Sequence, residues 1–103
     1  MESENIYMIE ITMSDNHIEM SGHACRKGEN GIDRACAAVS ALTCNLINSL
    51  RELTGDIIQA EMDSGHTVID WEEISEGGYL LVNSWLLGLQ DINREYNCIK
   101  FSN

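Results

Sequence analysis

The sequence predicts an α+β layer sandwich in which two helices pack on a mostly antiparallel sheet, with the element order ββαββαβ. Three observations support this fold class. Two segments carry apolar residues at helical spacing, two pairs of alternating segments flank short turns, and a short apolar segment closes the chain. With 103 residues, 44% of them hydrophobic, we expect a single domain over residues 1–103.

The first hairpin is predicted from alternation near the N-terminus. Residues 6–13 alternate apolar and polar side chains and are rich in β-branched residues. Ser14-Asp15-Asn16 supplies the turn, and residues 17–20 return as the second strand. Residues 22–32 then carry three glycines among polar residues, which predicts an irregular loop.

The first helix is predicted from apolar residues that recur every three or four positions. Asp33 is a suitable N-cap, and Thr54-Gly55 ends the pattern because glycine is a common helix stop. The predicted buried stripe consists of Ala35, Val39, Leu42, Leu46, Leu50 and Leu53.

The second half of the chain repeats the pattern of a hairpin followed by a helix. Residues 57–62 and 67–71 flank Asp63-Ser64-Gly65-His66, which is typical of a second hairpin. A second helix is expected from about residue 75 to residue 96, and residues 98–101 form a closing strand. The buried stripe predicted for this helix is Val82, Trp85, Leu86, Leu89 and Ile92.

The charge of the chain favours basic partners. Seventeen Asp and Glu residues against six Lys and Arg residues give a net charge of −11. Such a field repels phosphate backbones and attracts basic proteins, so we expect no direct binding of nucleic acid. No secretory signal is visible, and no segment reaches the ~20 apolar residues of a membrane span. We therefore expect a cytoplasmic protein without membrane association, whose four cysteines are thiols.

One stretch of the sequence brings together the groups of a thiol enzyme. Gly22-His23-Ala24 is followed by a glycine-bearing loop and then by Cys36. If Asp33 is the N-cap, Cys36 is the third helical residue, where free N–H groups and the helix dipole favour a thiolate. The dipole contributes ~0.3–1 kcal/mol, which lowers a thiol pKa by less than about one unit, so a further cation is needed. The candidates are His23, Arg26, Lys27 and Arg34.

A thiol paired with an imidazole is the minimum apparatus for acyl transfer. The thiolate attacks the carbonyl, the imidazolium protonates the leaving amine, and N–H groups at the helix start serve as oxyanion donors. Ser40 lies one turn after Cys36, and Asp33 is available to orient His23 as well as to cap the helix. The common alternative is that Cys36 is a small buried hydrophobe and His23 a solvated loop residue, and spacing alone leaves both interpretations open.

Gly22-His23-Ala24 followed by Gly31-x-Asp33-x-x-Cys36-Ala37-Ala38-Val39-Ser40 resembles the two motif blocks of the ribosomal-processing cysteine protease family, Prp. A weaker likeness continues through Gly78-Tyr79-Leu80 to the final strand, so it covers nearly the whole chain. The resemblance implies a cytoplasmic, homodimeric cysteine endopeptidase. It also implies the substrate, a short N-terminal extension of the basic large-subunit ribosomal protein numbered twenty-seven.

The resemblance further implies the role of individual residues. His23 and Cys36 correspond to the catalytic dyad, and Asp33 and Ser40 to supporting residues around the nucleophile. A flexible loop over the active site corresponds here to residues 25–32. The residues of this loop that we expect to meet the substrate are Cys25, Arg26, Lys27, Gly28 and Gly31.

Two departures from the family pattern bear on function. Arg34-Ala35 stands where the family has an apolar pair, which puts the fit of the family's substrate in doubt. Cys25 adds a second thiol two residues after His23, which gives the hypothesis of a regulatory Cys25–Cys36 disulfide.

Two other functions stay open on the sequence alone. A non-catalytic acidic module that chaperones a basic ribosomal protein fits the composition equally well. A small redox protein would depend on Cys25 as well as Cys36, but the chain has no C-x-x-C motif. Neither C-x-x-C nor H-x-x-x-H spacing is present, so we expect no metal site and no cofactor.

The remaining distinctive residues have structural explanations. Cys44 and Cys98 are expected to be buried packing residues, and His17 and His66 to be solvated. Trp71 and Trp85 are expected in the core or at a dimer interface. A last group of acidic residues is expected to be a solvated approach to the second helix, or a surface that steers a basic partner. Its members are Asp70, Glu72, Glu73 and Glu76.

Overall fold

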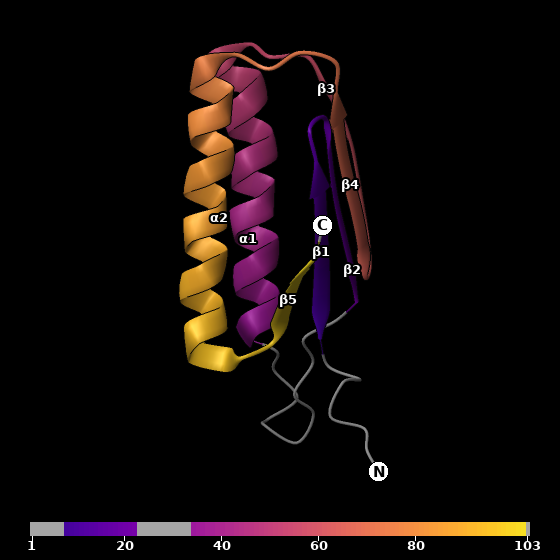
Figure 1. Cartoon of the computed structure of the whole chain (residues 1–103), viewed down its shortest axis with the longest axis vertical. Coiled ribbons are helices and arrows are strands. Elements are labelled where there is room, and N and C mark those ends of the chain that lie inside the picture. Colours follow the sequence, from indigo (N-terminus) through magenta and orange to yellow (C-terminus); the bar gives the residue numbers. More distant parts are fainter. Residues whose placement is uncertain (1–7, 23–33, 103) are drawn as a thin grey trace.

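Five strands and two long helices form two layers, in the order that the sequence predicts (Figure 1). The structure is a computed structural model that describes residues 8–22 and 34–102. The elements are β1 (Ile9–Ser14), β2 (His17–Gly22), α1 (Arg34–Ser49), the π-helical turn η2 (Leu50–Thr54), β3 (Ile58–Asp63), β4 (His66–Trp71), α2 (Glu76–Tyr96) and β5 (Ile99–Ser102). The predicted order ββαββαβ and the α+β fold class are therefore confirmed.

The five strands form one mixed sheet, and both helices cover the same face of it (Figure 1). The strand order is β3-β4-β2-β1-β5. The pairs β1–β2, β2–β4 and β3–β4 are antiparallel, whereas β5 returns from α2 and pairs parallel to β1. Strands β3 and β5 are consequently the two edges of the sheet.

The core lies between the sheet and the helices. Alternate strand residues such as Ile11, Ile18 and Ile69 are almost fully buried, as the period of two in a strand requires. From the helices, the buried residues are Ala35, Val39, Thr43, Leu46, Ile47 and Leu50 of α1 and η2, and Gly78, Val82, Trp85 and Leu89 of α2. Trp71 and Trp85 are both core residues.

The prediction for Leu53 is wrong, because its side chain is 75% exposed. Leu50 is fully buried, and an α-helix would place the residue three positions later on the same face. From Leu50 onward, however, the helix widens into the π-helical turn η2, which changes the angle between successive side chains. The predicted stop at Gly55 is confirmed, since this residue caps the turn with a left-handed φ of 73°.

One buried polar contact joins the two helices. The hydroxyl of Thr43 on α1 donates to the Val39 carbonyl at 2.7 Å and accepts the indole N–H of Trp85 on α2 at 3.1 Å. Both side chains are almost completely buried. The contact therefore satisfies a polar group that would otherwise be costly to bury, and it fixes how α2 lies against α1.

We expect Thr43→Val to lower the free energy of unfolding by about 1–3 kcal/mol, because it leaves the buried Trp85 N–H without its acceptor. The Trp85→Phe protein lacks that N–H. In this background, Thr43→Val should lower the free energy of unfolding by an amount that is smaller by about 1 kcal/mol or more. Urea denaturation of the four proteins measures both quantities. Equal costs in the two backgrounds would contradict the role given to this hydrogen bond.

Candidate active site

Cys36 lies at the start of α1, where the sequence predicts it. It is the third residue of the helix and is half-buried, with Ala35 buried before it. Its side chain lines a small cavity of about 50 Å³ together with Ser40, one turn further along α1. The thiol is thus close to the N-terminus of α1, the positive end of the helix dipole, which favours an anion.

The cavity beside Cys36 is formed by three segments that are distant in the sequence. Gly22 lines it from the end of β2, and the β3–β4 hairpin contributes Asp63, Gly65 and His66. Gly22 holds the end of β2 against this hairpin, because its N–H donates to the Gly65 carbonyl at 2.9 Å. The structure therefore brings the Cys36 end of α1 to the place where the chain leaves β2.

Two of the predicted site residues, Cys36 and Ser40, are brought together in this cavity. The others lie outside the described residues, and the predictions for them stay predictions. They are His23, Cys25, Arg26, Lys27, Gly28, Gly31 and Asp33.

Backbone geometry explains why a glycine precedes His23 in the sequence. Gly22 has a φ of +104°, which side chains of L-residues rarely allow. A Cβ added at Gly22 would also lie 2.3 Å from the carbonyl oxygen of Met8. The end of β2 can therefore approach the chain before β1 this closely only if position 22 lacks a side chain.

The prediction for Cys44 is wrong, and the prediction for Cys98 is confirmed. Cys98 is fully buried, but Cys44 is exposed on α1, two turns beyond Cys36. The Cys44 Sγ lies 3.6 Å from the Sδ of Met62 on the edge strand β3. The expectation of burial rested on the apolar character of cysteine, but Cys44 lies outside the stripe of buried α1 residues, so its side chain faces outward beside the edge strand.

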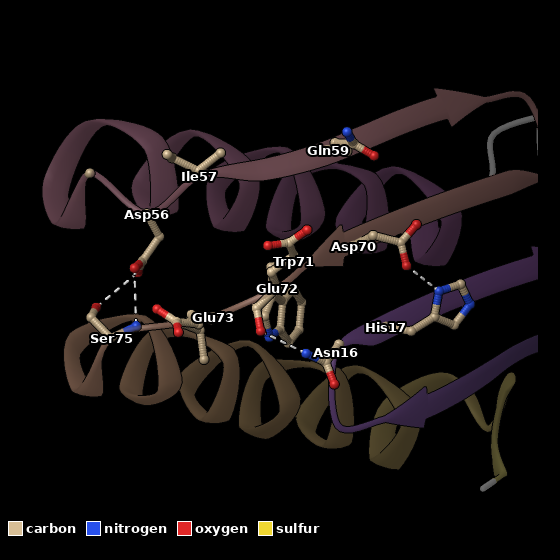
Figure 2. Close-up of a pocket in the computed structure, with 12 residues that line it drawn as sticks. Asn16, His17, Asp56, Ile57, Gln59, Asp70, Trp71, Glu72, Glu73 and Ser75 are labelled. Atoms are coloured by element: carbon tan, nitrogen blue, oxygen red, sulfur yellow. Dashed lines mark hydrogen bonds and ion pairs between the residues drawn. The ribbon is translucent and has the colours of Figure 1, made fainter.

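A larger cavity, of about 830 Å³, lies at the opposite end of the molecule (Figure 2). It is formed where β2 begins, where β3 follows η2, and where β4 leads into α2. Three residues of the predicted acidic group line it, namely Asp70, Glu72 and Glu73, together with Asp56. The sequence pointed to the acidic group but not to the cavity, because the cavity depends on how distant segments meet.

Asp56 is used in capping the second helix (Figure 2). Its carboxylate accepts the Ser75 N–H at 3.0 Å and the Ser75 hydroxyl at 2.8 Å, while the Ser75 hydroxyl accepts the Gly78 N–H at 3.0 Å. Hydrogen bonds from Thr54 and then from Ser75 lower the pKa of Asp56. Asp56 is therefore a structural anion that links the end of η2 to the start of α2.

Of the two histidines expected to be solvated, His66 is exposed and His17 is half-buried, and both are also bonded to carboxylates. His17 contacts Asp70 through Nδ1, and its Nε2 lies 3.3 Å from Glu19 (Figure 2 shows the first contact). His66 Nε2 lies 2.7 Å from the second oxygen of Glu19. Pairing of β2 with β4 brings these groups together, and the sequence does not reveal that pairing.

This chain of contacts changes the protonation of its members. The hydrogen bond that His17 makes to the Asp70 carboxylate, followed by that to Glu19, raises the pKa of His17 above its ordinary value. The hydrogen bond with His66, followed by that with His17, lowers the pKa of Glu19. Both effects favour the charged forms at the outer face of β2 and β4.

Residues 8–22 and 34–102 contain no group of three or more His, Cys, Asp and Glu side chains arranged to hold a metal ion. Within the same residues, neither helix combines the length and the apolar character needed to cross a bilayer.

Comparison with known proteins identifies relatives that span most of the chain. A family model described as cysteine protease Prp matches residues 8–99. Among curated proteins, none matches the chain.

Several solved structures are similar to this one over 92% of the chain. One is an essential ribosomal processing protease Prp from S. aureus with a covalently linked product peptide, at 28% identity, with 98% of that chain covered and a TM-score of 0.75. Another holds the S. aureus protease with a substrate peptide, at 29% identity, 96% coverage and a TM-score of 0.75. A protein from Streptococcus mutans is 31% identical, with 96% of its chain covered and a TM-score of 0.73.

We expect Gly22→Ala to lower the free energy of unfolding by about 2 kcal/mol or more, since it combines a disallowed φ with a backbone clash. Gly55→Ala is the matched control: φ is also positive there, but an added Cβ meets nothing within 4 Å. The control should cost only about 1 kcal/mol. Thermal denaturation compares the two, and a Gly22→Ala protein as stable as the control would contradict the close approach of Met8.

We expect the contribution of His17 to stability to depend on pH. Because its pKa is raised by folding, the stabilisation is fully present below the unfolded pKa and is lost as the pH rises through the folded pKa. His17→Gln should therefore destabilise the protein more at pH 5.5 than at pH 8.5, by less than about 1 kcal/mol because the pair is partly exposed. Urea denaturation at both values measures this, and Asp70→Asn should reduce the difference.

Proposed function

The chain belongs to the Prp family of cysteine proteases, and on that premise we propose that it is an endopeptidase that processes a ribosomal protein through a Cys36–His23 dyad. The observation that carries the proposal is the position of Cys36, half-buried at the start of α1 in a cavity that Gly22 also lines. His23 is the next residue of the chain after Gly22. This adjacency supports an imidazole within reach of the thiol.

Acyl transfer by this dyad would begin with attack by the Cys36 sulfur on the carbonyl carbon of the scissile peptide bond. The thiol proton passes to His23, and the negative charge develops on the carbonyl oxygen. N–H groups at the start of α1 would stabilise this oxyanion, since the first turn of a helix has no partners of its own for them. This step needs only the thiol, the imidazole and the helix terminus.

The intermediate would then collapse with cleavage of the C–N bond. His23 returns its proton to the leaving amine, and a thioester joins Cys36 to the acyl part of the substrate. Water, deprotonated by His23, attacks the thioester, releasing a carboxylic acid and regenerating the thiol. Ser40 and Asp33 would support the dyad, and residues 25–32 would close over the peptide.

The substrate that we propose is the N-terminal extension of a basic ribosomal protein, of the type numbered twenty-seven in the large subunit. Two observations support a basic ribosomal substrate. The S. aureus proteases at 28% and 29% identity are described as ribosomal processing proteases. The net charge of −11 also favours the approach of a basic protein.

The proposal extends to the state and location of the protein. We propose that residues 1–103 act as one protease domain, in the cytoplasm and as a homodimer. The exposed apolar side chains of Tyr79, Leu80 and Leu87 on α2 support a protein interface, because apolar groups that gather on a surface favour burial against a partner.

We expect Cys36→Ala and His23→Ala each to reduce cleavage of a peptide that spans the extension by about 10³-fold or more, because each removes one half of the dyad. His17→Ala is the matched control, since it also deletes an imidazole but at the opposite end of the molecule, and it should cleave at close to the wild-type rate. Mass spectrometry of the peptide identifies the bond that is cut.

The same assay separates the protease from its rival. An acidic chaperone would bind the peptide and leave it intact in the wild-type protein as in Cys36→Ala. Binding without cleavage by the reduced wild-type protein would therefore overturn the proposed enzyme. Cleavage that persists in His23→Ala at the wild-type rate would overturn the dyad.

A further inference from the structure

We propose that the substrate peptide binds as an additional strand on the free edge of β3, with alternate side chains entering a groove between β3 and α1. The inference rests on the proposed function, because it describes how the same site would hold its peptide. It assigns substrate recognition to Ala60 and Met62 of β3 and to Cys44 and Ile47 of α1.

The first support is that β3 is an edge strand whose outer hydrogen-bonding groups can be assigned. The N–H of Gly22 donates to the Gly65 carbonyl, and the N–H of Trp71 donates to the Asn16 carbonyl at 3.1 Å. In the register of β2 with β4, these bonds mean that odd-numbered residues of β4 bond to β2. The even-numbered residues of β4 must then bond to β3.

The register of β3 with β4 shows which residues of β3 direct their backbone groups to the free edge. The even-numbered residues of β4 oppose Gln59, Glu61 and Asp63, so these three bond inward. The intervening residues direct their N–H and C=O groups away from β4, to the side where no further strand lies among the described residues. These edge residues are Ile58, Ala60 and Met62.

The second support is that two of these edge residues also line a groove. Ala60 and Met62 border a hollow of about 230 Å³, whose opposite wall is Cys44, Ile47, Asn48 and Arg51. The hollow is apolar where Ile47, Ala60 and the sulfur atoms of Cys44 and Met62 meet, and polar at Asn48 and Arg51. Backbone groups for pairing and an apolar surface for side chains thus occur side by side.

The third support is continuity with the proposed nucleophile. Met62 lines both this hollow and the smaller cavity of Cys36. On α1, Cys36 and Ser40 line the smaller cavity, and Cys44 and Asn48, each a further turn along the helix, line the hollow. The twelve residues from Cys36 to Asn48 rise about 18 Å, which is the length of about five residues of extended peptide.

A peptide strand in this position would be recognised through its backbone and through its side chains. Hydrogen bonds to the backbone of Ala60 and Met62 would hold any sequence, as in other cases of strand addition. Side chains opposite those two residues would point into the groove, and those between them would point to the other face of the sheet. The proposal therefore predicts a preference for apolar residues at two substrate positions separated by one.

Protection of Cys44 from alkylation tests the binding position directly. In the Cys36→Ala protein, a saturating substrate peptide should slow the reaction of Cys44 with iodoacetamide by about tenfold or more, as measured by mass spectrometry of the fragment that carries Cys44. A scrambled peptide of the same composition should have no effect. Because the readout is one cysteine-containing fragment, alkylation of other thiols does not interfere.

Each outcome of this test has a defined meaning. If the substrate peptide binds by fluorescence anisotropy and Cys44 reacts at an unchanged rate, the groove is overturned while the dyad stands. If the wild-type protein neither binds nor cleaves the peptide, the proposed function itself fails. Protection that rises with protein concentration in the absence of peptide would assign the β3 edge to a second copy of the chain and overturn the proposal.

A pair of matched variants tests the groove in the active enzyme. Cys44 and Asn45 are both exposed neighbours on α1, but only Cys44 lines the groove. Cys44→Trp should raise KM for the peptide about tenfold or more and change kcat by less than about twofold, because it fills the groove without touching the thiol. Asn45→Trp should leave both constants within about twofold, and equal effects of the two variants would overturn the proposal.

Discussion

The rotation of α1 on the sheet is the constraint on which the site depends. Ala35 and Val39 are both almost fully buried, and they flank Cys36 in the sequence. Their burial against the sheet fixes the face that α1 turns inward, so Cys36 and Ser40 are directed to the margin of that contact and into the cavity at the end of β2. Further along α1, the hydrogen bond between Thr43 and Trp85 fixes the same orientation, because rotating α1 about its axis would break this bond.

The two ends of the molecule have different physical characters. At one end, Asp56, Ser75 and Thr54 satisfy one another, and the result is a rigid junction between η2 and α2. At the other end, a glycine with positive φ, a tight turn and a helix N-terminus meet around a half-buried thiol. The first arrangement uses its polar groups for stability. The second leaves a half-buried thiol beside a small surface cavity, as the proposed nucleophile requires.

The local elements could be predicted from the sequence, because caps, turns and periodicity are local properties. Ser75 caps α2 and Gly55 caps η2, as the residue types suggest. What the sequence does not reveal arises mostly between distant segments. His17 and His66 find partners 53 and 47 residues away in the chain, across the β2–β4 pairing. Leu53 was misplaced because periodicity cannot reveal where a helix widens, and Cys44 because its residue type was weighed above its place outside the apolar stripe.

The size of the cavities bears on how so small a protein could recognise a peptide. Pockets that enclose a ligand usually measure ~300–1,000 Å³, whereas the cavity of Cys36 measures about 50 Å³. The described residues around Cys36 therefore do not enclose a peptide. An extended peptide also brings backbone N–H and C=O groups that need partners when water is displaced. The edge of β3 has such groups beside a hollow that shares Met62 with the cavity of Cys36, so in the proposed binding mode one extended conformation would serve both binding to the edge and presentation to Cys36.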